Sequence, residues 1–209
     1  SSEGTADIAV GDFYCTTESN KTIILPRNAA GIPTGLTCKG IVFHIIDDFE
    51  TFKSTNDLND SNLNGYQEKH GLVVSTKKGN NFGTVAAADI EQAFIDGNVE
   101  KYTDTETSNG YKLTQILVGT ENLGFIALNN HTEKLNNSTA WYAPSFNELK
   151  YLIQGENTQT GSTSGQEYIN KQLKKINADE LAGTIPSVTF YNGVGDHGLR
   201  LMTGGSENA

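Results

Sequence analysis

Positive charge is scarce in this chain of 209 residues, which has 15 Lys and Arg against 25 Asp and Glu and a net charge of −10. Proteins that bind nucleic acid neutralise phosphates with clustered basic side chains, but the densest basic stretch, Lys171–Lys175, is an ordinary helix face. No apolar run approaches the length of about 20 residues that a membrane span requires. The composition therefore excludes nucleic-acid-binding and membrane-spanning proteins.

Cysteine is also scarce, because Cys15 and Cys38 are the only two. Two cysteines exclude a disulfide-dense scaffold and a metal site built from cysteines. They could form a disulfide that closes a loop of about 22 residues. They could equally remain two half-buried thiols on neighbouring strands, and the sequence leaves both alternatives open.

Proline is rare, with 4 residues, whereas the chain has 22 Gly and about a fifth of it is Asn or Thr. This profile is typical of turns, polar strands and surface loops, and not of a helical bundle or a disordered tail. We expect residues 1–7 to be a flexible lead-in or linker and residues 8–209 to form a single domain.

In the first part of the chain, four segments are predicted to be strands, and one long segment between them is not. Gly40–Ile46 is a nearly continuous β-branched and aromatic run, which is typical of a central strand buried on both faces. The other predicted strands are Asp7–Cys15, Thr22–Leu25 and His70–Ser75. Asp47–Gln67 is polar and too long for a tight turn, so we predict a surface loop there.

The middle of the chain is predicted to be helical. The helices expected from apolar spacing are Ala86–Asp96, Tyr111–Val118 and Asn122–Leu135. Ser145 and Glu148 have the spacing of a capping box, which predicts that a further helix begins at this point. Its inward residues are expected to be Phe146, Leu149, Leu152 and Ile153.

The end of the chain is predicted to return to strands after one more helix. After a polar loop over Gly155–Gly165, that helix turns Ile169, Leu173 and Ile176 inward. Two last strands are expected at about Thr184–Tyr191 and Gly198–Thr203. Strands first, helices between and strands last predict an α+β fold with an antiparallel sheet.

No group of residues has the pattern of a catalytic centre. The four histidines are scattered, and no nucleophile elbow or phosphate loop occurs, so no catalytic residue and no cofactor are expected. We expect His44 and His70 to be structural, hydrogen-bonded histidines on core strands. The spacing of Asp57, Asn59, Ser61 and Glu68 matches positions of a calcium loop, but Asn62 replaces the required glycine, so this is only a weak metal candidate.

Aromatic side chains are the other candidates for binding, since rings stack on sugar faces and Asn side chains add hydrogen bonds. The ligand-binding candidates are Trp141, Tyr142, Tyr191 and Asn192. The alternative interpretation is that the single Trp beside a helix start is part of the core.

Five short motifs occur in an order that resembles a known family. They are Gly11-Asp12-Phe13-Tyr14, Cys38-Lys39-Gly40-Ile41-Val42-Phe43, His70-Gly71-Leu72-Val73-Val74, Trp141-Tyr142-Ala143-Pro144-Ser145-x-x-Glu148-Leu149 and Ile169-Asn170-x-x-Leu173. This series resembles the C-type-lectin-like modules of surface and fimbria-associated proteins of gut Bacteroidales, which are described as cell-adhesion proteins.

The resemblance implies a C-type-lectin-like fold with a mainly antiparallel sheet and several packed amphipathic helices. It does not carry over a calcium sugar site, because the Glu-Pro-Asn, Gln-Pro-Asp and Trp-Asn-Asp triplets of calcium-dependent lectins are missing. The related formylglycine-generating enzymes need a late cysteine pair, and no Cys follows Cys38. A neighbouring segment or a partner chain could complete the sheet, as donated strands do in pili.

We therefore expect a non-enzymatic, exported module at the bacterial cell surface, associated with the outer membrane or a fimbria. Its function would be cell adhesion or fimbria (pilus) assembly, with protein partner subunits or a host surface glycan or protein as partners. The alternatives are a calcium-independent glycan-binding domain and an enzyme of unrecognised type.

Overall fold

The fold is described from a computed structural model of the chain. The described residues are 8–59, 69–77, 87–99, 106–119, 135, 138–142, 144–156 and 162–181. Several sequence predictions lie outside these ranges: the lead-in 1–7, almost all of the helix Asn122–Leu135, both last strands, and the candidate residues Ser61, Glu68, Tyr191 and Asn192.

The described strands form one antiparallel sheet in the order β2-β1-β3-β4. Their bounds are Phe13–Thr17 for β1, Thr22–Leu25 for β2, Leu36–Ile46 for β3 and His70–Ser75 for β4. The predictions for β2 and β4 agree with these bounds. Together with the helices, this sheet confirms the α+β class predicted from the sequence.

The strand β3 lies between β1 and β4, as the apolar run predicted. Four successive residues, Gly40–Phe43, are buried, so both faces of the strand are covered here. Gly40 permits the close approach of β4, since a Cβ at this position would lie 2.3 Å from a methyl carbon of Val73. The strand begins at Leu36, four residues before its predicted start, so the predicted bound was wrong.

The first strand begins at Phe13, later than the predicted Asp7. Gly11 has a φ of +97°, a left-handed conformation that turns the chain before the strand. The Asp12 carboxylate then accepts hydrogen bonds from the backbone N–H of Ala9 at 2.8 Å and of Arg27 at 2.9 Å. This turn separates the buried Ile8 from the strand, although both belong to the same apolar pattern.

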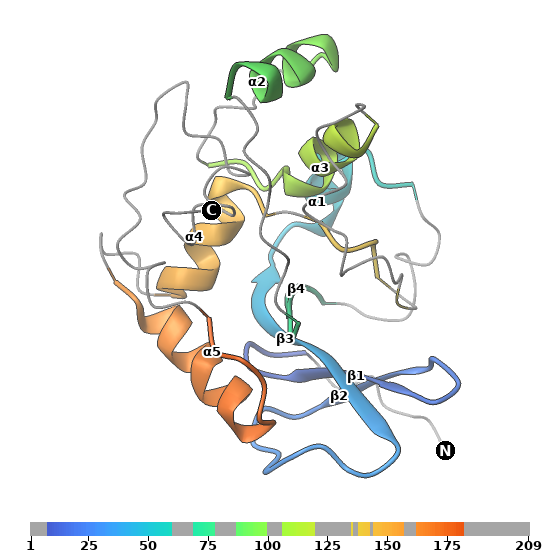
Figure 1. The fold of residues 1–209 in the computed structure, drawn as a ribbon, viewed down its shortest axis with the longest axis vertical. Helices are drawn as coiled ribbons and strands as arrows, with labels where there is room; N and C mark the ends of the chain where they lie inside the picture. Colours follow the sequence, from blue (N-terminus) through green and yellow to red (C-terminus); the bar gives the residue numbers. More distant parts are fainter. Residues whose placement is uncertain are drawn as a thin grey trace.

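Five helices are described. Their bounds are Phe49–Thr55 for α1, Ala87–Asp96 for α2, Gly110–Val118 for α3, Phe146–Gln154 for α4 and Ser164–Lys175 for α5. In Figure 1, α4 and α5 lie along one side of the sheet, whereas α1, α2 and α3 lie beyond one end of β3. α4 and α5 contact each other and β3, and α2 contacts α3.

The helix α1 contradicts the surface loop predicted over Asp47–Gln67. Asp48 caps it, because its carboxylate accepts a hydrogen bond from the Thr51 N–H at 3.0 Å and another from the Thr51 hydroxyl at 2.7 Å. Phe52 is buried in the main core and stacks against Phe49. Capping and the apolar pair three residues apart therefore form a short helix in a polar surrounding.

The main core lies between the sheet and the helices α1, α4 and α5. Its fully buried side chains include Phe13, Cys15, Ile41, Ile169 and Leu173. Leu149, Leu152 and Ile153 of α4 are buried there as predicted, and Ile176 is half-buried against the same core. A second, smaller core is formed by α2 and α3 around Phe94 and Leu113.

Candidate functional site

The candidate site is built around the start of α4, directly after the candidate residues Trp141 and Tyr142. The Ser145 hydroxyl oxygen accepts a hydrogen bond from the Glu148 N–H at 3.4 Å, and Glu148 Oε1 accepts one from the Ser145 N–H at 3.0 Å. This reciprocal arrangement is the predicted capping box. It places the Glu148 carboxylate in the interior, where its side chain has no exposed area.

The Glu148 carboxylate also joins two other segments. Its Oε1 accepts a hydrogen bond from the Gly110 N–H at 2.9 Å, at the first residue of α3. Its Oε2 accepts a short hydrogen bond from the Tyr142 hydroxyl. One buried carboxylate thus satisfies three donors, from α3, from the Ser145 cap and from the segment before α4.

Burial dominates the electrostatics of this pair. Burial raises the pKa of the Glu148 carboxyl, and hydrogen bonds from Tyr142, Ser145 and Gly110 oppose this shift. Burial also raises the pKa of the Tyr142 hydroxyl, and the neighbouring Glu148 carboxylate raises it further. The phenol therefore remains protonated and is the donor in the pair.

A second buried polar group also forms hydrogen bonds around the start of α3. The Asn56 amide, with 2% of its surface exposed, donates to the carbonyl oxygens of Phe52 and Ser108, each at 2.9 Å. Its Oδ1 accepts from the Lys112 N–H at 3.2 Å. Asn56 therefore ties the end of α1 to the beginning of α3.

Two further hydrogen bonds hold α4 against the segment before α3. The Ser145 hydroxyl donates to the Thr107 carbonyl oxygen at 3.1 Å, and the Asn147 amide donates to the Ser108 hydroxyl at 3.0 Å. We call Asn56, Tyr142, Ser145, Asn147 and Glu148 the polar junction. The hydrogen bonds of the polar junction hold the end of α1 and the starts of α3 and α4 together. The junction therefore positions these three helices.

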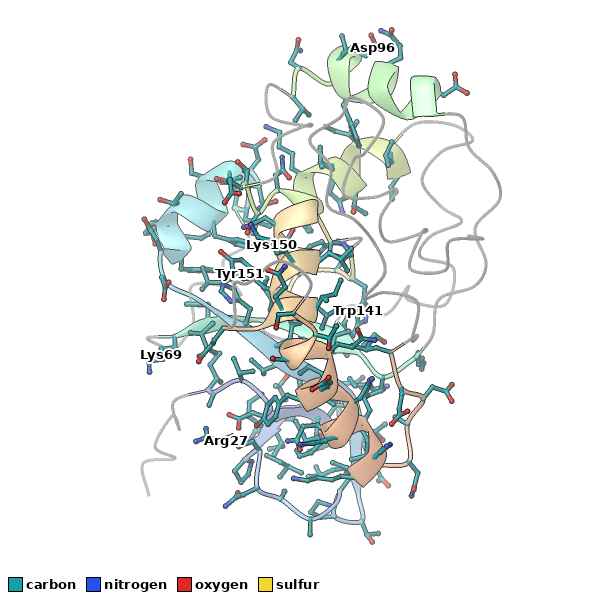
Figure 2. The ribbon with its side chains drawn as sticks, turned by 90° about the vertical axis from the view of Figure 1, so that its left-hand side faces the viewer. Arg27, Lys69, Asp96, Trp141, Lys150 and Tyr151 are labelled. Carbon is teal, nitrogen blue, oxygen red and sulfur yellow. The ribbon has the colours of Figure 1, made fainter. Side chains whose placement is uncertain are left out.

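The junction determines how the two aromatic candidates are presented. The Tyr142 ring contacts the Tyr111 ring edge-on, with centroids 5.9 Å apart, and packs on the main core. Trp141 is half-buried and lies near the middle of the molecule (Figure 2). Tyr142 thus acts as an anchor for this segment, and its hydroxyl is occupied by Glu148.

The two strand histidines stack on aromatic rings. The His44 ring lies parallel to the Tyr151 ring of α4, with centroids 3.7 Å apart, and the His70 ring lies parallel to the Phe49 ring at 3.5 Å. Burial lowers the pKa of His44, and the Asp47 carboxylate opposes this shift. Ring stacking, which the sequence did not indicate, positions both histidines.

The lowered pKa of His44 predicts a loss of stability in acid. Unfolding restores the usual value of 6.5, so neutral His44 stabilises the fold fully above that pH and less as the pH falls below it. In urea unfolding between about pH 8 and pH 5, we expect the His44→Phe variant to show a flatter pH dependence than the wild type. Equal slopes for the two proteins would contradict this prediction.

The calcium-loop candidate is only partly described. Asp57 follows α1 and is exposed, and it forms an ion pair with the half-buried Lys112, with 3.1 Å between Asp57 Oδ2 and Lys112 Nζ. Asn59 is exposed, and Ser61 and Glu68 lie outside the described residues. Among the residues that the structure describes, no three His, Cys, Asp or Glu side chains lie close enough together to hold a metal ion.

The two cysteines lie opposite each other on β1 and β3, and both are free thiols. Cys15 has no exposed surface, whereas Cys38 is half-buried. Positions on neighbouring strands are compatible with both arrangements that the sequence left open, the disulfide and the two thiols.

Sequence reasoning missed the residues that complete the junction from other parts of the chain. Asn56 lies in the segment predicted to be a loop, and Gly110 contributes only its backbone N–H. Their partners are 52 and 38 residues away. No local pattern could have indicated either contact.

Comparisons of the chain with protein-family models, with curated proteins and with solved structures found no match. In the described ranges, no helix combines the length and the hydrophobicity needed to cross a bilayer.

Proposed function

We propose that this chain is an exported surface module that supports cell adhesion or fimbria assembly by accepting a strand from a protein partner. The observation that carries the proposal is the position of β2, which is the outermost described strand at one edge of the sheet. Within the described part of the chain, no strand lies beyond β2. An unpaired sheet edge is the usual acceptor in donor-strand assembly.

The backbone direction of β2 follows from the turn that joins it to β1. The Thr17 N–H donates to the Lys21 carbonyl oxygen at 2.9 Å. Hydrogen-bonded and non-hydrogen-bonded pairs alternate along an antiparallel ladder. Counted from this hydrogen bond, Tyr14 and Ile24 form a non-hydrogen-bonded pair. The N–H and C=O of Ile24 therefore point away from β1, toward the side where a partner strand would lie.

The surface chemistry supports the same proposal. A net charge of −10 and a high content of Asn and Thr are typical of a solvated, exported surface. The resemblance to surface and fimbria-associated modules agrees with this role. We place the protein at the bacterial cell surface, with a partner subunit or a host surface protein or glycan as its target.

The substitution Ile24→Pro tests the edge directly. It removes an N–H that faces away from β1, which edge strands tolerate. On a non-adherent bacterium that displays the chain, we expect retention on mucin and epithelial cells to fall by about tenfold, the equivalent of one interface hydrogen bond. Ile24→Ala, which also truncates the side chain but keeps the N–H, should retain more cells than Ile24→Pro.

The same assay separates the alternatives. Retention no higher than that of the host without the chain would overturn the proposal. Retention that is unchanged in Ile24→Pro but lost in Trp141→Ala, and that resists a calcium chelator, would instead favour the glycan-binding alternative. Circular dichroism of each purified variant confirms that the fold is intact.

A further inference from the structure

Cys15 and Cys38 occupy directly opposite positions on the central strands β1 and β3. Opposite residues of an antiparallel pair alternate between a hydrogen-bonded and a non-hydrogen-bonded arrangement, and the second brings the side chains closer together, with about 4.5 Å between the Cα atoms. The kind of pair that the two cysteines form therefore sets how close their side chains come.

Two hydrogen bonds, one between backbone groups and one from a side chain, show that the cysteines form a non-hydrogen-bonded pair. The Thr17 N–H points toward β2, because it donates to the Lys21 carbonyl oxygen. Backbone groups alternate in direction along a strand, so those of Cys15, two residues earlier, also point toward β2 and away from β3. On the other strand, the Cys38 carbonyl oxygen points toward β4, because it accepts a hydrogen bond at 3.2 Å from the hydroxyl of Thr76, the residue that follows β4. Both backbones therefore point outward from the pair.

The side chains of this pair meet on the core face of the sheet. Cys15 belongs to the main core and Cys38 packs against it. The Cα separation of about 4.5 Å expected for such a pair lies within the range of about 4.4–6.8 Å that disulfides span. Strand register thus provides a geometry that a disulfide can adopt without moving the backbone.

We propose that Cys15 and Cys38 are a redox couple that closes to a cross-strand disulfide between β1 and β3. This inference goes beyond adhesion or assembly, because it assigns a modification to the protein's own core. The bond would enclose all of β2, since β2 lies between the two cysteines in the sequence. Oxidation would therefore link β1, which lies next to the proposed acceptor strand β2, covalently to the central strand β3.

The different burial of the two thiols sets the order of the reaction. Cys38 is half-buried and Cys15 is not exposed, so a small disulfide such as oxidised glutathione reaches Cys38 first. The hydrogen bond between the two thiols lowers the pKa of Cys38 and raises the pKa of Cys15. Both features make Cys38 the attacking thiolate.

The exchange balances in two steps. The Cys38 thiolate attacks one sulfur of oxidised glutathione, breaks its S–S bond and releases one glutathione thiolate. Cys15 then loses its proton to solvent and attacks the Cys38 sulfur of the mixed disulfide, which releases the second glutathione. Two protein thiols are oxidised to one disulfide, and one glutathione disulfide is reduced to two thiols.

The test is a titration of the full chain with mixtures of reduced and oxidised glutathione, read by intact mass. We expect a product that has lost two hydrogen atoms and carries no glutathione. The equilibrium constant for its formation should be about a hundredfold larger in the native chain than in the chain held unfolded in urea, because a compatible native geometry favours the bond. A native constant equal to or below that of the unfolded chain would overturn the proposal.

Single substitutions test the order of attack. Cys15→Ser should stop at a mixed disulfide on Cys38, and Cys38→Ser should remain unmodified under the same conditions because Cys15 is buried. Equal glutathione adducts on both variants would contradict the assigned roles. The mass of the oxidised wild type tests the couple itself, even if a variant folds poorly.

Discussion

Replacing Glu148 by Ala is expected to destabilise the protein by about 3–5 kcal/mol, because three buried donors lose their acceptor and each unsatisfied donor costs about 1–3 kcal/mol. The donors are the N–H groups of Gly110 and Ser145 and the hydroxyl of Tyr142. Their individual costs do not add fully, since the vacated space allows some relaxation. Urea unfolding at neutral pH, followed by circular dichroism, measures the loss.

Two comparisons show whether the acceptor or the helix position matters. Glu148→Gln keeps an acceptor oxygen for both N–H groups and removes a buried charge, so we expect a loss of about 1 kcal/mol or less. Glu167 lies in the first turn of α5 and accepts a hydrogen bond from the Thr163 hydroxyl at 2.9 Å, but it is exposed. Glu167→Ala should cost less than about 0.5 kcal/mol, and a similar cost for Glu148→Ala would contradict the role of the junction.

Features encoded within a few residues could be predicted from the sequence. The capping box at Ser145 and Glu148 needs only two side chains three positions apart, and the structure confirms both of its hydrogen bonds. The strands β2 and β4 were predicted with their observed bounds because turn residues or polar stretches border their apolar runs. The α+β class followed from the order of such elements.

Features that depend on tertiary packing could not be predicted. The helix α1 lies in a polar segment, and its stability comes from Phe52 in the core and from the Asp48 cap. The polar composition of the whole segment Asp47–Gln67 hides these two signals. The first strand was placed too early because the apolar pattern from Ile8 to Phe13 does not reveal the turn at Gly11.

The candidate site shows the same division. The sequence singled out Tyr142 as an aromatic that could meet a ligand, but the carboxylate that holds its hydroxyl is known only once the helix is placed. The cysteines were recognised as a possible pair, yet their direct opposition depends on an irregularity between Tyr14 and Cys15 in the register of β1 against β3. A shift of one residue would place their side chains on opposite faces of the sheet.

The second large effect is expected for Asn56→Asp, which changes one atom of a buried side chain. In the wild type, the Asn56 amide donates to the carbonyl oxygens of Phe52 and Ser108. A carboxylate oxygen in its place faces two acceptors and loses both hydrogen bonds, while its charge remains buried. We expect a loss of about 3 kcal/mol or more at neutral pH, measured by urea unfolding.

The pH dependence of this variant identifies the cause. Burial and the two carbonyls raise the pKa of the new carboxyl above its unfolded value, so the folded state binds the proton more tightly. The destabilisation should therefore shrink as the pH falls through the raised pKa of this carboxyl, because the protonated carboxyl can donate one of the two lost hydrogen bonds. Asn28, which is exposed, offers the matched control: Asn28→Asp adds the same charge and should change the free energy of unfolding by less than about 0.5 kcal/mol. A loss in Asn56→Asp that stays constant with pH would show that packing, and not the reversed hydrogen bonds, holds the end of α1 against α3.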